Sequence, residues 1–336
     1  MDGSHFSSID PARSEGTATR VMLRGFSRRA LDDSMLGRTA ARHTQLGPGT
    51  LEVSIERLRL DSAALRLASF STAVRATVEP APGIVTIGIA LAATEPFIVS
   101  ARRAEVGTLT VFGDEDLAEV RYPGGSSSVT LAMPAACYAE AIGSPARVEM
   151  LQARGGNPMV QLDKNALARV SDIVRAVYRI GDDPAGPASD GRWKANAEVA
   201  LVEVFYSALA DPLAVTGVPR ERLRSMRAVI LAAEAVMDED PISIPSVPRL
   251  CRTLGTSRRT LERAFHDMLG QSPAHYLRVR ALNASREQLL QSRRVPGMVT
   301  RVAIDNGFWH MGRFAVAYRA LFGERPTDTL RRSGAA

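Results

Sequence analysis

The chain has 336 residues, of which 45% are hydrophobic and 23% are charged, and its formal net charge is +6. This length suffices for about two domains of ~100–200 residues, and the apolar fraction excludes an intrinsically disordered chain. With two cysteines, Cys137 and Cys251, the sequence excludes a disulfide framework and a zinc site of the usual cysteine-based kind.

The N-terminal residues 1–30 are rich in Ser, Arg, Gly and Thr and have no lasting periodicity, which predicts a mostly flexible tail. The first twenty residues lack the apolar segment of a signal peptide. No apolar stretch approaches the ~18–20 residues that a membrane span requires. We therefore expect a cytoplasmic protein with no membrane partner.

Residues 51–133 contain short segments in which apolar and polar residues alternate, beginning with LEVSIERLRL and separated by Pro and Gly. Short strands with such turns are typical of a β-sandwich or a small barrel. From about Leu162 the period becomes helical, and two helices are predicted over residues 162–180 and 196–210. These helices can form a dimer surface or pack back onto the sheet. Together these elements predict a β-rich domain over residues 31–210.

Residues 222–336 have the periodicity of seven helices, which predicts a second, all-helical domain. Ser257 and Gly270 are suited to begin and end a helix, so a first helix-turn-helix is expected over about 247–269. A second one is expected over about 299–322. The helix between them, starting at Ser272–Pro273, would be ~30 Å long, close to the ~34 Å turn of B-DNA.

The charge is distributed unevenly along the chain. From Val247 to the C-terminus there are sixteen arginines, no lysine and six acidic residues, a net charge of +10, whereas the preceding residues carry −4. A basic region of this kind indicates a polyanionic partner such as double-stranded DNA. A solvated basic face without a partner is the alternative.

Two segments of this region resemble the AraC/XylS family of transcription regulators. They are LCRTLGTSRRTLERAFHDMLGQSPAHYL, from residue 250, and VAIDNGFWHMGRFAVAYRALFGERPTDTLRR, from residue 302. The landmarks are the pairs Gly307–Phe308 and Arg313–Phe314 and the stretch FGERPTDTL. The resemblance implies a DNA-binding domain with two helix-turn-helix motifs, whose second helices enter the major groove.

The resemblance also implies base contacts from the outward faces of both recognition helices. The residues carried over are Arg259, Glu262 and Arg263 in the first helix and His310, Met311, Arg313 and Val316 in the second. Arginine can bind guanine through two hydrogen bonds, and glutamate can accept one from cytosine. Family members often have a second basic residue at the position of Val316, so here base reading is expected to depend on Arg313.

Other side chains of these helices have expected roles that carry no base specificity. Arg258, Arg301 and Arg319 are candidates for phosphate contacts, which position a protein on DNA. Trp309 is expected to wedge into the domain core near Phe308. Cys251 is expected to be a small buried core residue.

The N-terminal region resembles the companion domain of the same family, a cupin-like sensing module followed by dimerising helices. The expected fold class is therefore α+β, with a β-rich sensing and dimerisation domain before an all-helical DNA-binding domain. The resemblance implies a homodimeric activator that responds to a small-molecule effector and acts with RNA polymerase.

Two alternatives remain open at this point. The protein can be a regulator without a small ligand, controlled by a protein partner or by its abundance. It can also be an enzyme with a site in the barrel and an appended DNA-binding module. A polar pocket with a perturbed acid or base would favour the enzyme, and an apolar pocket lined by residues such as Phe97 or Phe112 would favour an effector.

The sequence offers no metal site or catalytic constellation for the enzyme alternative. Only His5 and His43 lie outside the C-terminal segment, which leaves too few histidines for a histidine-rich metal site. No Ser-His-Asp or Cys-His spacing and no phosphate-binding glycine loop is recognisable. We therefore expect no metal, no cofactor and no catalytic residues.

Overall fold

The computed structural model describes residues 19–24, 40–79, 82–113, 118–142, 157–181, 192–207 and 220–333. The stretches DDPAGPASDG (182–191) and DPLAVTGVP (211–219), whose Pro and Gly residues predict linkers, lie outside these residues. The strands are β1 (Thr19–Arg24), β2 (Ala40–Gln45), β3 (Glu52–Arg59), β4 (Ala64–Phe70), β5 (Val74–Glu79), β6 (Ile84–Ala92), β7 (Phe97–Val99), β8 (Arg102–Ala104), β9 (Thr108–Phe112), β10 (Ala118–Tyr122), β11 (Ser126–Pro134) and β12 (Met159–Gln161).

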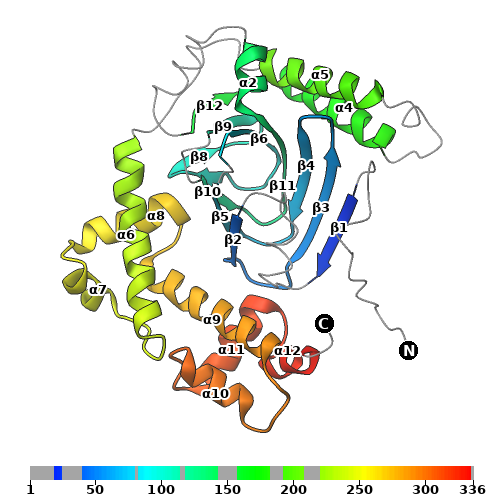
Figure 1. The fold of residues 1–336 in the computed structure, drawn as a ribbon. Helices are drawn as coiled ribbons and strands as arrows, with labels where there is room; N and C mark the ends of the chain where they lie inside the picture. The colour runs from blue at the N-terminus through cyan, green and yellow to red at the C-terminus, as the bar shows by residue number, and fades with distance from the viewer. Residues whose placement is uncertain are drawn as a thin grey trace, which may run out of the picture.

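The strands form two antiparallel sheets, which confirms the α+β class with a β-rich N-terminal half (Figure 1). One sheet has the order β1-β3-β4-β11-β6-β9-β12, and the other has the order β2-β5-β10-β7-β8. β1 pairs with β3 from Thr19↔Arg57 to Arg24↔Glu52. These six residues lie within the segment predicted as a flexible tail, and that prediction does not hold for them because the ladder fixes their backbone.

The β domain has two apolar cores, one on each face of the seven-stranded sheet. Val53 and Ile55 of β3 are buried between the two sheets, in a cluster that includes Phe97 and Tyr122. Leu65, like other residues on the opposite face of the seven-stranded sheet, packs against helices. Since successive side chains of a strand point to opposite faces, one sheet can serve both cores.

Three helices follow the strands of this domain: α2 (Ala135–Ile142), α4 (Lys164–Gly181) and α5 (Arg192–Ser207). Val170 and Val174 of α4 and Leu201 of α5 share a core with Ile87 and Leu131 of the sheet. The helical pair therefore packs onto the sheet, and its role as a dimer surface stays a prediction. Figure 1 shows α4 and α5 on the far side of the β domain from the C-terminal helices.

The C-terminal region contains the seven predicted helices: α6 (Arg220–Glu239), α7 (Val247–Thr253), α8 (Arg258–Leu269), α9 (Pro273–Gln291), α10 (Met298–Asp305), α11 (Met311–Phe322) and α12 (Pro326–Arg332). The serine caps are also confirmed. Ser257 and Ser272 accept hydrogen bonds from the backbone N–H groups of Thr260 and His275. None of the helices in the described residues is long and apolar enough to cross a membrane.

Candidate nucleic-acid interface

The two predicted recognition helices, α8 and α11, are held by one continuous apolar core. Leu261 and Phe265 of α8 and Phe314 and Tyr318 of α11 are almost completely buried in it. The ring centroids of Phe314 and Tyr318 are 5.5 Å apart. α9 joins the two helix-turn-helix motifs, and its 19 residues give it a length of about 28 Å at 1.5 Å per residue.

The outward face of α8 carries the charged residues expected there. Arg258 Nε lies 2.7 Å from Glu262 Oε1, and Arg263 Nε lies 3.5 Å from Asp267 Oδ2. Arg259 is exposed and has no ion pair among the described residues. The structure thus places the four residues expected on this face on one solvent-exposed surface: Arg258, Arg259, Glu262 and Arg263. Arg259 can bind DNA without first breaking an ion pair among the described residues.

The outward face of α11 is less charged. His310 is the N-cap residue of the helix, and both it and Arg313 are exposed. Met311 is half-buried against the core, and Val316 is 72% exposed. The two residues expected to contact phosphates, Arg301 and Arg319, are also exposed.

The placement predicted for Trp309 is wrong. Phe308 takes the core position, with 5% of its surface exposed and its ring centroid 5.0 Å from that of Phe314. Trp309 is the next residue and is directed away from the core, so that 64% of it is exposed. The indole therefore lies on the surface at the start of α11.

This difference between neighbouring aromatic residues predicts different effects on stability. Phe308→Ala should lower the free energy of unfolding by about 3 kcal/mol because it leaves a cavity. Trp309→Ala should change it by no more than about 0.5 kcal/mol, as exposed substitutions usually do. Urea unfolding of both variants measures this, and an equal loss would place the indole in the core after all.

The C-terminal helices pack directly against the five-stranded sheet of the β domain. Leu46 and Ala73, next to β2 and β5, belong to the apolar core of the helices. The side chain of Asn283 on α9 pairs with β2, the edge strand, as a neighbouring strand would. It accepts from the backbone N–H of Gln45 at 3.1 Å and donates to the Gln45 carbonyl at 3.0 Å.

A buried charged cluster joins the same two regions. Arg75 on β5 donates two hydrogen bonds to Glu119 on β10, at 2.8 and 2.9 Å. It also lies 2.6 Å from Glu234 on α6 and contacts the hydroxyl of Tyr276 on α9. The side chains of Arg75 and Glu119 are only 5% and 2% exposed. Sequence reasoning missed this cluster, because no local motif marks it.

The cluster determines how Glu234 titrates. Burial by itself would raise its pKa, but the positive charge of Arg75, the hydrogen bond from Tyr276 and the positive charge of Arg280 outweigh burial and hold the pKa below its ordinary value. The carboxylate is therefore ionised at neutral pH. Burial and the nearby carboxylate raise the pKa of Tyr276, so its hydroxyl stays protonated and donates to Glu234.

The C-terminal ends of both recognition helices lie against the β domain. Gly270, which ends α8 with φ 67°, lies so close to Ile98 of β7 that a Cβ would be 3.0 Å from the Ile98 Cδ1. Gly323, which ends α11 with φ 72°, lies against Thr50, whose backbone nitrogen would be 2.9 Å from such a Cβ. Glycine therefore permits both the left-handed φ and the close approach.

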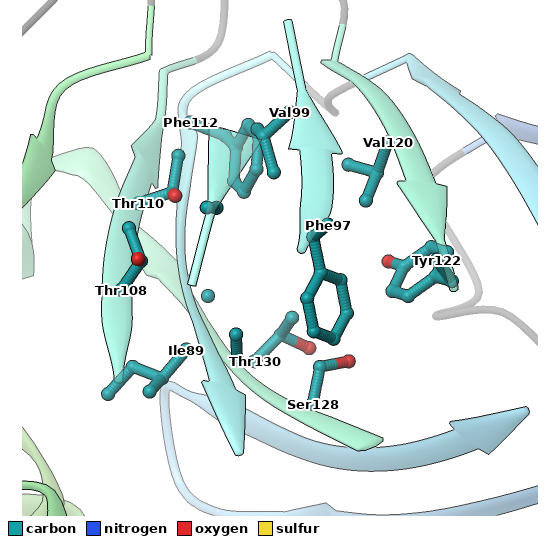
Figure 2. Close-up of a pocket in the computed structure, with 13 residues that line it drawn as sticks. Ile89, Phe97, Val99, Thr108, Thr110, Phe112, Val120, Tyr122, Ser128 and Thr130 are labelled. Carbon is teal, nitrogen blue, oxygen red and sulfur yellow. The ribbon is translucent and has the colours of Figure 1, made fainter. Parts of the chain in front are cut away.

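A small pocket lies between the two sheets; its cavity volume is about 40 Å³, and it is partly open to solvent. Figure 2 shows the rings of Phe97, Phe112 and Tyr122 around it, together with several hydroxyl groups. The lining residues include no Asp, Glu, His, Lys, Arg or Cys. The hydroxyl of Ser128, in a residue that is 7% exposed, has no hydrogen-bond partner within the described part of the chain.

The cysteines and other titratable groups form no further candidate site in the parts of the chain that the structure describes. Cys251 packs, partly buried, against the core of the C-terminal helices, and Cys137 is also partly buried. Within the described residues there is no group of three or more His, Cys, Asp or Glu that could hold a metal ion.

Comparisons with known proteins identify the C-terminal region. The family profile described as a helix-turn-helix domain matches residues 250–332. The XylDLEGF operon transcriptional activator 1 of Pseudomonas putida is 42% identical over 87 residues, which are 26% of this chain and 26% of the relative. The probable thc operon regulatory protein of Rhodococcus erythropolis is 35% identical over 86 residues, again 26% of each. Residues 250–332 thus match a helix-turn-helix domain, as the sequence predicts.

These relatives match this chain over only about a quarter of their own length. Among solved structures, the crystal structure of the AraC-like transcriptional activator CuxR aligns with 79% of this chain and 94% of its own, at 14% identity and a TM-score of 0.43.

Proposed function

We propose that this protein is a sequence-specific DNA-binding transcription regulator, which reads two boxes of one operator with α8 and α11. The observation that carries the proposal is the pair of recognition helices with exposed outward faces, joined by a helix of about 28 Å. This length is close to the ~34 Å turn of B-DNA, so both helices can enter successive major grooves on one face. Arg259, Glu262, Arg263, His310, Met311, Arg313 and Val316 are the proposed base-reading residues, and Arg258 is proposed to bind phosphate.

The proposal is tested by removing one arginine from each recognition helix. On an operator selected from random DNA, Arg263→Ala and Arg313→Ala should each relax discrimination at particular base pairs, by about 1–3 kcal/mol. Binding titrations on single-base variants of the operator measure this. A loss of affinity that is equal for all sequences would make the arginine concerned a phosphate contact instead.

The pocket of the β domain supports a small-molecule effector. Its lining is mostly apolar with several hydroxyl groups, and it contains no charged side chain. The buried hydroxyl of Ser128 has no partner among the described residues, and a polar group of a ligand could bond to it. The proposed effector is therefore an uncharged, mainly apolar molecule with at least one hydrogen-bonding group. The same lining disfavours an enzyme, since it supplies no acid or base.

Two strands connect this pocket with the DNA-binding helices. On β7, Phe97 and Val99 line the pocket, while Ile98 between them lies against Gly270 at the end of α8. On β10, Val120 lines the pocket and its neighbour Glu119 belongs to the cluster with Arg75. An effector that displaces these strands would displace the support of α8, and it regulates only if it binds one arrangement more tightly than the other.

We further propose that the regulator acts in the cytoplasm as a homodimer and activates transcription together with RNA polymerase. The resemblance to AraC/XylS regulators supports these assignments. The helical pair α4 and α5 is the proposed dimer surface, and the apolar Val199 of α5 is 57% exposed. Sedimentation of the full chain, free and on operator DNA, tests the dimer.

A further inference from the structure

The two recognition helices can be compared position by position. Each has 12 residues and ends in a glycine with a left-handed φ, and each glycine N–H is bonded to the carbonyl four residues before it. The buried residues coincide as well, with Leu261 at the place of Phe314 and Phe265 at the place of Tyr318. The helices therefore present equivalent outward positions.

The side chains at these equivalent outward positions are mostly charged in α8 and mostly uncharged in α11. The four charged outward residues of α8 correspond to four residues of α11 that carry no charge: Arg258 to Met311, Arg259 to Gly312, Glu262 to Ala315, and Arg263 to Val316. The one outward charge in the first turn of α11 is Arg313, which corresponds to Thr260. Nothing in the packing explains this difference, since Val316 is 72% exposed.

We propose that α8 and α11 read their boxes by different chemistry, and that α11 recognises the methyl groups of thymines through Val316 and its neighbours. The inference rests on the proposed function, because it assigns a chemical class of sequence to the box of α11. In the major groove the C5 methyl of thymine is the one apolar group on a base edge, and apolar side chains contact it.

The neighbours of Val316 favour this mode of reading. Gly312 and Ala315 have little or no side chain, so the α11 backbone can approach the base edges more closely than α8 can. Arg313 adds one hydrogen-bonding side chain, suited to a guanine within the box. The α8 box, by contrast, is read by arginines and Glu262, which select guanine and cytosine through hydrogen bonds.

The test replaces thymine by deoxyuridine, which pairs identically but lacks the methyl group. An operator is first selected from random DNA with the full chain, and the boxes are assigned to α8 and α11 by the discrimination lost in Arg263→Ala and Arg313→Ala. Deoxyuridine in the α11 box should weaken binding about fourfold for each methyl contacted. The same replacement in the α8 box should change the affinity less than about twofold.

Variants of Val316 link the effect to this side chain. Val316→Ala should weaken binding to the thymine operator but not to the deoxyuridine operator, so the difference between the two DNAs shrinks. Val316→Arg, with the residue that α8 has at the equivalent place, should shift the preference at that base pair toward guanine.

Three outcomes would overturn the inference. The first is an α11 box without thymine. The second is an equal effect of deoxyuridine in both boxes. The third is a loss of affinity in Val316→Ala that is equal for both DNAs. In these cases the apolar face does not read methyl groups, and a protein partner is its better explanation. If the full chain selects no shared sequence at all, the proposed function itself fails, and that result is distinguishable from the other three.

Discussion

Arg75→Ala is expected to lower the free energy of unfolding by about 3–5 kcal/mol. The guanidinium forms hydrogen bonds with Glu119 and an ion pair with Glu234, and its side chain is 5% exposed. Its removal leaves two carboxylates in a buried site with only the more distant cations Arg227 and Arg280, each 3.9 Å away, which costs more than the loss of the contacts alone. Chemical denaturation of the full chain at neutral pH measures the effect.

Arg103→Ala is the matched control for this variant. Arg103 is an exposed arginine of β8 in the same sheet, so its loss should change the free energy of unfolding by no more than about 0.5 kcal/mol. Equal effects of the two substitutions would contradict a buried, structural role of Arg75.

Because of the charged cluster, the difference in free energy of unfolding between wild type and Arg75→Ala should depend on pH. The pKa of Glu234 is lower in the folded protein than in the unfolded chain, so its ionised form contributes stability above the unfolded pKa. This contribution is lost as the pH falls through the folded pKa. The stability difference between wild type and variant should therefore shrink as the pH is lowered below about 4.

Phe314→Ala is expected to lower the free energy of unfolding by about 3–5 kcal/mol, by creating a cavity between two rings. Phe314 is 1% exposed and contacts the rings of Phe308 and Tyr318. The loss should be accompanied by weaker DNA binding, because this core orients the outward face of α11. Thermal and urea unfolding, together with titration of operator DNA, measure both effects.

Val316→Ala provides the comparison on the same helix. Val316 is exposed, so this variant should fold with almost unchanged stability while its DNA binding changes. A large loss of stability in Val316→Ala, or none in Phe314→Ala, would mean that the inward and outward faces of α11 are assigned incorrectly.

The C-terminal helices could be predicted in detail because their signals are local. Ser257 and Gly270 mark the ends of α8 through hydrogen bonds and backbone geometry within a few residues. The inward residues recur at helical spacing, so the outward faces of α8 and α11 follow by elimination. The strands of the β domain are marked in the same way by alternation and turns.

The contacts between the two halves could not be predicted from such signals. Arg75 lies 159 and 201 residues before its partners Glu234 and Tyr276, and in the sequence it looks like any exposed arginine in a strand. Asn283 also has a distant partner, since its side chain forms hydrogen bonds with the backbone of β2, which lies more than 200 residues earlier in the chain. The prediction for Trp309 fails for a different reason: aromatic residues usually lie in cores, and only the structure shows that Phe308 already fills this position.

The most direct test of the account is selection of bound sequences from a random DNA pool with the full chain at physiological salt. We expect enrichment of two boxes about one helical turn apart on one face of the DNA, one of them rich in guanine and cytosine and the other containing thymine. A pool that is retained without any shared sequence would contradict it, since the basic C-terminal region would then act only as a non-specific anchor.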